Sequence, residues 1–189
     1  FVVKDPVFEV KKLRSKLKEE DVPFENFFLA IGRLTNQKNH SLLLRAFKEI
    51  YMKNKKYNLL ILGDGELKKT LLTLSKKLRI SNNVYFIGNV ENVYKYIKKS
   101  ICVISTSLWE DPGFVMIESA VSRKIIISSD CPNGPQEFIG KNEAGYIFKS
   151  NDVNDLTDKI NIFLKDTQIN INLKKLNAIK RSREYSLFN

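Results

Sequence analysis

The chain contains little of what metal centres, disulfide frameworks and membrane spans are made from. It has two cysteines and one histidine among 189 residues, too few for a disulfide framework or for a Cys/His metal site. No apolar run approaches the roughly 18–20 residues that a membrane-spanning helix requires. We therefore expect no metal ion and no cofactor, and the low cysteine content favours a reducing, cytoplasmic compartment.

The N-terminal stretch is not expected to be a secretion signal. Residues 1–8 lack the basic, apolar and small-residue regions of a signal peptide and are typical of a linker. Helical spacing follows over residues 8–18. We predict a linker and first helix over residues 1–24, a main domain over 25–168 and a helical tail over 169–189, since this length suits one hydrophobic core.

Positive charge is in excess. The 32 Lys and Arg residues against 21 Asp and Glu residues give a net charge of +11. Such an excess favours phosphate-bearing partners, namely nucleotides, nucleic acid or an anionic membrane surface. Much of it lies in helical segments, at residues 11–18 and 174–183, where a solvated helix face is the simpler interpretation.

Short apolar runs alternate with amphipathic segments about five times. The apolar runs predict strands at residues 27–31, 57–62, 84–87, 101–104, 125–128 and 145–148. Amphipathic spacing predicts helices at residues 41–52, 67–78, 93–99, 114–121, 156–164 and 171–179. Because each crossover returns the chain to the same edge, the alternation predicts an α/β fold, a Rossmann-like open parallel sheet with helices on both faces.

The segment between the fourth predicted strand and its helix is the first candidate site. Ligands of open α/β sheets bind outside the carboxyl ends of the strands, and the N–H groups at a helix N-terminus favour an anion. The amides of Gly113, Phe114 and Val115 therefore predict an anion site. Glu110 and Glu118 flank it and can accept hydrogen bonds from hydroxyl groups of the same ligand.

Five motifs follow one another, each at the carboxyl end of a predicted strand. They read AIGRLTNQKN at 30–39, LGDGE at 62–66, VYFIG at 84–88, EDPGFVMIE at 110–118 and SDCPNGPQE at 129–137. In order and spacing they resemble the C-terminal, donor-binding domain of retaining GT-B glycosyltransferases, the glycosyl transferases group 1 family. The resemblance covers roughly residues 5–167 and implies one half of a GT-B fold.

The resemblance implies a nucleotide-diphospho-sugar, a UDP- or GDP-sugar, as substrate. It assigns Arg33 and Lys38 to the leaving diphosphate, whose developing negative charge they would stabilise in catalysis. The planar donor fork of Arg and the mobile ammonium of Lys both suit a diphosphate. The alternative is that both are surface cations beside a turn.

The resemblance also places two glycines and the third predicted strand beside the nucleotide-sugar donor. Gly32 and Gly63 would lie beside the donor, where glycine permits tight turns and close backbone approach. Ile87 would form an apolar wall of the nucleobase pocket. Plain strand-to-helix turns and a strand that ends in glycine explain these residues equally well.

Glu110 and Glu118 carry the most specific part of the resemblance, which assigns catalytic Glu110 to the sugar and Glu118 to the ribose. A solvent-facing helical glutamate is the alternative for Glu118. The chain departs from the family pattern at Asp111-Pro112, where Gly-Phe is usual, so the shape of the sugar pocket is open. The segment 132–137 resembles a subset whose donors are often N-acetylated hexosamines.

Two further side chains adjoin these motifs. His40 stands at a helix start, where a structural or capping role is the simpler interpretation. Trp109 could cover the sugar or pack in the core.

The family resemblance implies a second, acceptor-binding N-terminal domain as a partner. The parent reaction would be retaining transfer to a glycan or lipid-linked acceptor, with possible peripheral contact between the basic surface and an anionic inner membrane leaflet. We expect the chain to bind the donor and not to transfer the sugar alone. The alternatives are a GT-B nucleotide-sugar epimerase, which lacks the glutamate pair, and a nucleic-acid-binding module, which leaves the glutamates unexplained; no nucleic acid is expected.

Overall fold

The computed structural model describes residues 22, 24–110 and 113–185. Its centre is a six-stranded sheet in which every pairing between neighbouring strands is parallel. The strands are β1 (Phe27–Ile31), β2 (Asn58–Leu62), β3 (Val84–Gly88), β4 (Val103–Ser105), β5 (Ile126–Ser129) and β6 (Tyr146–Phe148). Their order across the sheet is β3-β2-β1-β4-β5-β6.

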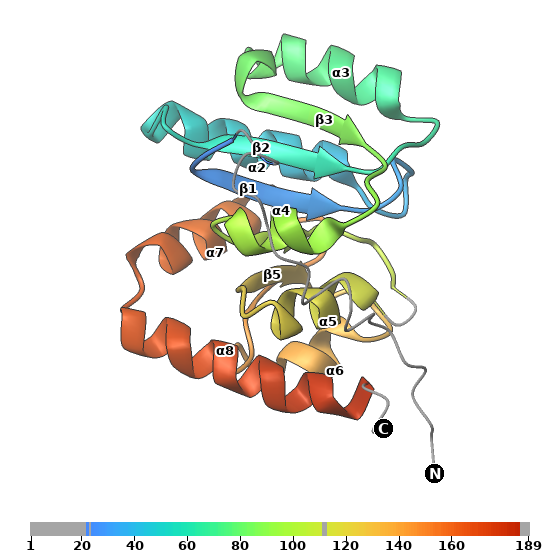
Figure 1. Cartoon of the computed structure of the whole chain (residues 1–189). Coiled ribbons are helices and arrows are strands. Elements are labelled where there is room, and N and C mark those ends of the chain that lie inside the picture. The colour runs from blue at the N-terminus through green and yellow to red at the C-terminus, as the bar shows by residue number, and fades with distance from the viewer. Residues whose placement is uncertain (1–21, 23, 111–112, 186–189) are drawn as a thin grey trace.

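Helices cover both faces of the sheet (Figure 1). They are α2 (His40–Lys53), α3 (Lys68–Lys77), α4 (Val93–Lys99), α5 (Phe114–Val121), α6 (Pro135–Ile139), α7 (Val153–Lys165) and α8 (Gln168–Ser182), with short 3-10 helices at Ser81–Asn83 and Arg183–Tyr185. The predicted α/β fold with a parallel sheet and helices on both faces is confirmed. The predicted helix at residues 8–18 lies outside the described residues.

Two apolar cores lie on opposite faces of the sheet, because neighbouring residues of a strand point to opposite sides. Phe28 belongs to the core under α2, α3 and α7, where Phe47 and Ile160 are buried with it. Its neighbour Phe27 belongs to the core under α4, α5 and α6, together with Ile117. Central strands that are buried on both faces read as continuous apolar runs, which explains why the sequence reveals them.

The largest difference from the predicted elements is α6. Its segment follows Gly134 and begins with a proline, and it is absent from the predicted helices. Proline is compatible with the first turn of a helix, where its missing N–H would have no intrahelical partner. The helix α7 also begins three residues earlier than predicted, because the Asp152 carboxylate caps it by accepting hydrogen bonds from the amides of Asn154 and Asp155 at 3.0 Å each.

The strand order positions the site. From β1 the chain moves outward to β2 and β3 and then returns to pair β4 with β1, so the order reverses between these two strands. At such a point the loops that follow the two strands diverge to opposite faces and leave a crevice at their carboxyl ends. The loops after β1 and β4 carry the AIGRLTNQKN and EDPGFVMIE motifs.

Candidate functional site

Hydrogen bonds join the loops after β1 and β4. The Thr106 hydroxyl donates to the carbonyl of Lys38 at 2.8 Å. The amide of Leu108 donates to the carbonyl of Gln37 at 2.8 Å, and the Gln37 side chain donates to the carbonyl of Trp109 at 3.0 Å. These contacts fix the two loops against each other, so that Lys38 and Glu110 approach from opposite sides.

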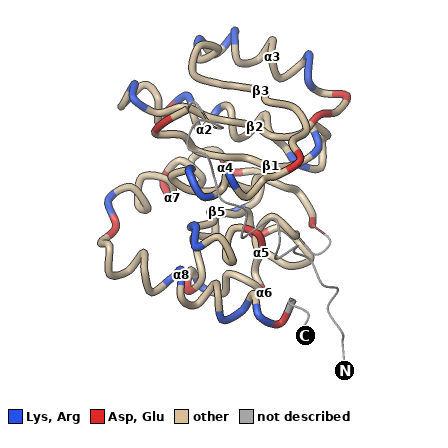
Figure 2. The backbone as a smooth tube through the Cα atoms, viewed as in Figure 1, with Lys and Arg blue, Asp and Glu red and all other residues tan. Residues whose placement is uncertain are grey.

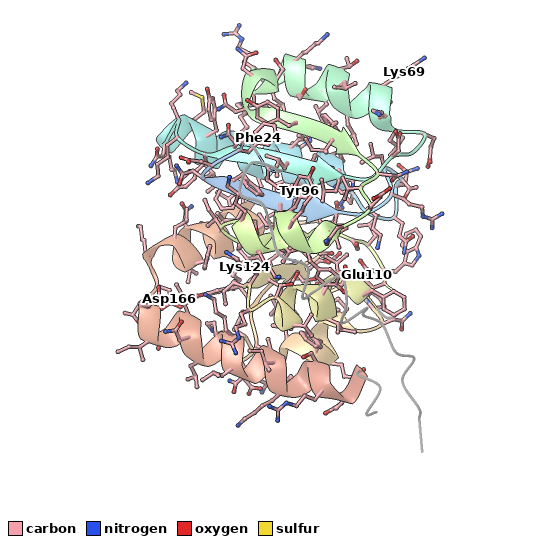
Figure 3. All side chains as sticks on the ribbon, viewed as in Figure 1. Phe24, Lys69, Tyr96, Glu110, Lys124 and Asp166 are labelled. Atoms are coloured by element: carbon pink, nitrogen blue, oxygen red, sulfur yellow. The ribbon has the colours of Figure 1, made fainter. Side chains whose placement is uncertain are left out.

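Lys38 and Glu110 form a bridging ion pair at the centre of the site. The Lys38 ammonium lies 2.8 Å from each oxygen of the Glu110 carboxylate. Glu110 is only 7% exposed, and its Oε1 also accepts a hydrogen bond of 2.5 Å from the Ser107 hydroxyl. In Figure 3 the labelled Glu110 lies beside α5. A buried carboxylate is costly unless it is paired, and Lys38 and Ser107 supply the partners that compensate for the burial of Glu110.

Gly32 explains how Lys38 reaches this carboxylate. A Cβ atom on Gly32 would lie 3.2 Å from the Cγ and Cδ atoms of the Lys38 side chain. The absence of a side chain lets the Lys38 stem pass directly over the backbone at the end of β1. Gly32, one of the predicted donor-binding residues, therefore shapes the path of the catalytic candidate.

Arg33 differs from Lys38 in its surroundings. Its side chain is exposed, and it makes no hydrogen bond or ion pair with the part of the chain that the structure describes. The guanidinium is thus available to an anionic ligand. The structure brings Lys38 and Glu110 together and leaves Arg33 apart from them.

Gly63 holds the loop after β2 against the loop after β1. Its amide donates to the carbonyl of Gly88 at 2.8 Å, and the amide of Gly32 donates to the carbonyl of Leu62 at 3.0 Å. A Cβ atom on Gly63 would lie 2.1 Å from the carbonyl oxygen of Gly32. Gly63 is therefore required by backbone packing, whatever ligand lies beside it. Ile87, just before Gly88, is half-buried and packs on the second core.

The N-terminus of α5 is open. Gly113 precedes the helix with φ of 80°, in the left-handed region, and no side chain caps the first turn. A Cβ atom on Gly113 would lie 2.7 Å from the Met116 methyl carbon. Phe114 is 43% exposed and Val115 is half-buried. The predicted anion site thus lies at the N-terminus of α5, a helix of eight residues. The first N–H groups of this helix have no side-chain acceptor among the described residues.

Glu118 is half-buried on α5, one turn after this N-terminus. Burial raises the pKa of its carboxyl from the ordinary 4.5 to about 7. Its carboxyl group makes no hydrogen bond or ion pair within the described ranges. A fully solvent-facing glutamate, the alternative from the sequence, does not fit this environment. A carboxyl with free oxygens at a helix start can accept hydrogen bonds from a ligand.

Three further groups complete the site, and of these the two serines were not predicted. Ser105 and Ser107 contact the Glu110 carboxylate, the former at 3.5 Å. The loop after β5 is the third group. It contacts the loop after β4, because the amide of Glu110 donates to the carbonyl of Pro132 at 3.2 Å. This loop lines an open cavity of about 520 Å³ that includes Asp130, Gln136 and Glu137. Ser105 and Ser107 could have been found from the sequence, because polar residues directly after an apolar strand lie at the edge of the sheet where ligands bind.

Trp109 and His40, the two other side chains considered from the sequence, differ in their exposure to solvent. Trp109 is 48% exposed, so it is not a core residue. His40 is 5% exposed, and neither of its ring nitrogens has a hydrogen-bond partner among the described residues. Burial lowers the pKa of His40 to about 4, although the backbone of Gly32 and Arg33 opposes this shift. A neutral, buried imidazole under the loop after β1 has a structural role.

The described part of the chain has neither a cluster of metal ligands nor a helix that could span a membrane. No group of three or more His, Cys, Asp and Glu side chains there could hold a metal ion. Among the same residues, no helix combines the length and the apolar character needed to cross a bilayer.

Comparisons with known proteins connect this geometry to a family. A family model described as glycosyl transferases group 1 matches residues 12–183. The chain is 39% identical over 140 residues to an uncharacterized glycosyltransferase of Methanocaldococcus jannaschii. The aligned region covers 70% of this chain and 34% of the relative. It thus spans about a third of that protein.

A second relative has a named reaction. It is the N-acetylgalactosamine-N,N'-diacetylbacillosaminyl-diphospho-undecaprenol 4-alpha-N-acetylgalactosaminyltransferase of Campylobacter jejuni. The identity is 30% over 161 residues, covering 85% of this chain and 43% of the relative.

Two solved structures are similar to this chain. Staphylococcus aureus TarM, crystallised with fondaparinux, α-GlcNAc-glycerol and UDP, gives a TM-score of 0.79 at 25% identity over 86% of this chain and 33% of that one. The C-terminal domain of a glycosyl transferase group 1 family protein (LpcC) of Francisella tularensis gives a TM-score of 0.77 at 17% identity. That match covers 98% of this chain and 97% of the domain, and it shows that the chain has the fold of one half of the GT-B architecture.

Proposed function

The chain belongs to the glycosyl transferases group 1 family, and from this premise we propose that it is the donor-binding domain of a retaining glycosyltransferase. The proposed donor is a UDP-linked N-acetylhexosamine. The observation that carries the proposal is the Lys38–Glu110 ion pair at the point where the strand order reverses. It joins a cation suited to a diphosphate and a carboxylate suited to sugar hydroxyls beside an open helix N-terminus.

The diphosphate would bind between the two loops. Its oxygens would accept hydrogen bonds from the amides at the start of α5, and the exposed Arg33 would approach from the rim. Lys38 would turn from Glu110 to the phosphate that becomes the leaving group. As the glycosidic bond breaks, the bonding electrons go to the diphosphate, and these cations stabilise the charge that develops on it.

Glu110 and Glu118 would orient the two ends of the donor. Release of Lys38 frees the Glu110 oxygens, held by Ser107, to accept hydrogen bonds from sugar hydroxyls. Glu118 would accept hydrogen bonds from the ribose. A carboxylate that accepts bonds from two neighbouring hydroxyls fixes the ligand in one orientation.

The nature of the donor is supported by the relatives. TarM was crystallised with UDP and α-GlcNAc-glycerol, and the named Campylobacter relative is an N-acetylgalactosaminyltransferase. The loop after β5 carries the segment that resembles N-acetylhexosamine enzymes. Transfer itself is proposed to need a second, acceptor-binding domain, and the acceptor is proposed to be a glycan or a lipid-linked sugar.

Titration calorimetry tests the assignment. With UDP and UDP-GlcNAc as ligands, Glu118→Ala is expected to weaken both by about 10- to 100-fold, the loss of one or two hydrogen bonds to a charged group. Glu110→Ala is expected to remove the preference for UDP-GlcNAc over UDP. The matched control is Glu49→Ala, an exposed glutamate on α2. If both site variants bind as the control does, or if GDP-mannose binds better than either UDP ligand, the proposal is wrong.

A further inference from the structure

Two consecutive hydroxyl residues, Thr106 and Ser107, follow β4 and contact the two partners of the ion pair. The strands of the described sheet contain no Lys, Arg, Asp or Glu residue (Figure 2), so the charged groups of the site belong to loops. Thr106 and Ser107 are 2% and 1% exposed. Thr106 donates to the backbone that carries Lys38, and Ser107 donates to the side chain of Glu110.

The Ser107 hydroxyl gives its proton to the Glu110 carboxylate. A hydroxyl carries one proton, and the Ser107 oxygen lies 2.5 Å from the Glu110 Oε1. With that proton used, the Ser107 oxygen can still accept a hydrogen bond from the Ser105 hydroxyl, 3.3 Å away. Because Ser107 belongs to the same loop as Glu110, this contact does not depend on the position of Lys38.

A third hydroxyl fixes the backbone of Ser107. The pairing of β4 with β5 ends at Ser105 and Ser128. Beyond this point the Ser129 hydroxyl donates to the carbonyl of Ser107 at 2.6 Å, and both residues are buried. The attachment to β5 therefore extends to the residue that contacts Glu110.

Thr106 fixes the backbone from which the Lys38 side chain extends. Its hydroxyl oxygen lies 2.8 Å from the carbonyl oxygen of Lys38 and 3.1 Å from that of Asn39, so its single proton is shared between the two. The lysine side chain is flexible. With its backbone fixed, the ammonium can move between Glu110 and a nearby anion without a shift of the loop.

Buried hydroxyls elsewhere in the chain have local partners. Ser75 on α3 and Thr157 on α7 each donate at 2.8 Å to a carbonyl three or four residues earlier in their own helix. Such bonds satisfy the hydroxyl and connect no other element. Thr106 instead bonds a carbonyl 68 positions away, and Ser107 bonds a charged side chain. Their partners are the two residues at the centre of the site.

We propose that Thr106 and Ser107 are positioning residues for the donor. Thr106 acts on the diphosphate through Lys38, and Ser107 acts on the sugar through Glu110. This inference rests on the proposed function and deepens it. When Lys38 turns to the diphosphate, Glu110 loses its cation, and the Ser107 hydroxyl keeps the buried carboxylate in place. The other carboxylate oxygen, Oε2, then accepts a hydrogen bond from a sugar hydroxyl.

Titration calorimetry with UDP and UDP-GlcNAc separates the two roles. Ser107→Ala is expected to lower the affinity for UDP-GlcNAc about tenfold and to leave that for UDP unchanged, since a hydrogen bond to a charged group is lost. Thr106→Val is expected to weaken both ligands alike by several-fold, and Thr106→Ser to restore both. The matched controls are Ser75→Ala and Thr157→Val, which remove buried hydroxyls outside the site.

Two results would overturn the inference alone. The first is that Ser107→Ala and Thr106→Val bind as their controls do, while Glu110→Ala and Lys38→Ala weaken binding. The second is that Ser107→Ala weakens UDP as much as UDP-GlcNAc, which is the result of a merely structural role. Failure of the proposed function differs from both, because the natural chain itself would then bind neither ligand, and the inference would fall with it. Circular dichroism checks that each variant folds. Should Thr106→Val unfold, Thr106→Ala replaces it, with the same several-fold loss of both ligands expected.

Discussion

Lys38 and Glu110 are separated by 72 positions in the sequence and by 2.8 Å in the structure. Before a donor binds, each neutralises the other, so neither the buried carboxylate nor the ammonium is left alone. Under the proposed function, a diphosphate would give the ammonium another anionic partner and would free the carboxylate for hydroxyl groups. A single pair of side chains can therefore couple phosphate binding to sugar binding.

The raised pKa of Glu118 predicts a pH-dependent stability. Between about pH 4.5 and 7 the folded chain holds a proton here that the unfolded chain releases, so this contribution is full below pH 4.5 and is lost as pH rises through 7. Glu118→Gln cannot ionise. Relative to the natural chain, we expect it to be more stable by about 3 kcal/mol at pH 8 and by almost nothing at pH 4.

Urea denaturation at both pH values measures this difference in the free energy of unfolding. The exposed Glu49 provides the matched control, since Glu49→Gln should give the same small effect at pH 4 and pH 8. An advantage of Glu118→Gln that does not change with pH would show that the carboxyl titrates normally.

His40 predicts the opposite slope. Its pKa is lowered from 6.5 to about 4, so between these values the unfolded chain binds more protons and stability falls as pH drops. Because His40 is the only histidine, its ring signals in an NMR titration are free of overlap. We expect them to stay those of neutral imidazole down to about pH 5, and a midpoint near 6.5 would contradict the buried environment.

At the scale of elements, the loops after β1 and β2 depend on glycine. The missing side chain of Gly63 leaves room for the carbonyl oxygen of Gly32, only 2.1 Å from where a Cβ atom would lie. Gly88 has a φ of 85°, but a Cβ atom there would meet nothing within 4 Å. These two glycines therefore separate the effect of a backbone clash from that of backbone strain.

Gly63→Ala is expected to destabilise the fold by about 3 kcal/mol or more, since backbone atoms must move. Gly88→Ala should cost only about 1–2 kcal/mol, the strain of a left-handed residue. Urea denaturation at neutral pH measures both. Equal losses for the two variants would mean that the close contact at Gly63 is not a constraint.

The strands and long helices could be predicted because burial repeats along the sequence. Apolar runs such as 27–31 are buried on both faces, and amphipathic spacing over 41–52 follows one core. The helix α6 could not be predicted in this way, because its five residues are too few to show a period. Its position depends instead on Phe138 and Ile139, which pack into the second core.

At the scale of the whole molecule, the sequence predicts which residues lie near the site, but it does not predict the contacts between them. Motifs at strand ends indicated Lys38, Glu110 and Glu118, since parallel strands bring their carboxyl ends to one edge. The ion pair, the hydroxyl of Ser107 and the burial of Glu118 depend on how two distant loops pack, which no local pattern encodes. The residue assignments to the donor remain predictions.

The glycine contacts also divide this edge of the molecule into a part that resists change and a part that tolerates it. The loops after β1 and β2 are fitted backbone to backbone at Gly32 and Gly63, so an insertion in one would have to be matched by the other. The loops after β4 and β5 share a hydrogen bond from Glu110 to Pro132, and the segment after β5 lines an open cavity. The loop after β4 is itself tied to the loop after β1 by the hydrogen bonds of Thr106, Gln37 and Leu108. Under the proposed function, new donor sugars are therefore expected to arise mainly through the segment after β5.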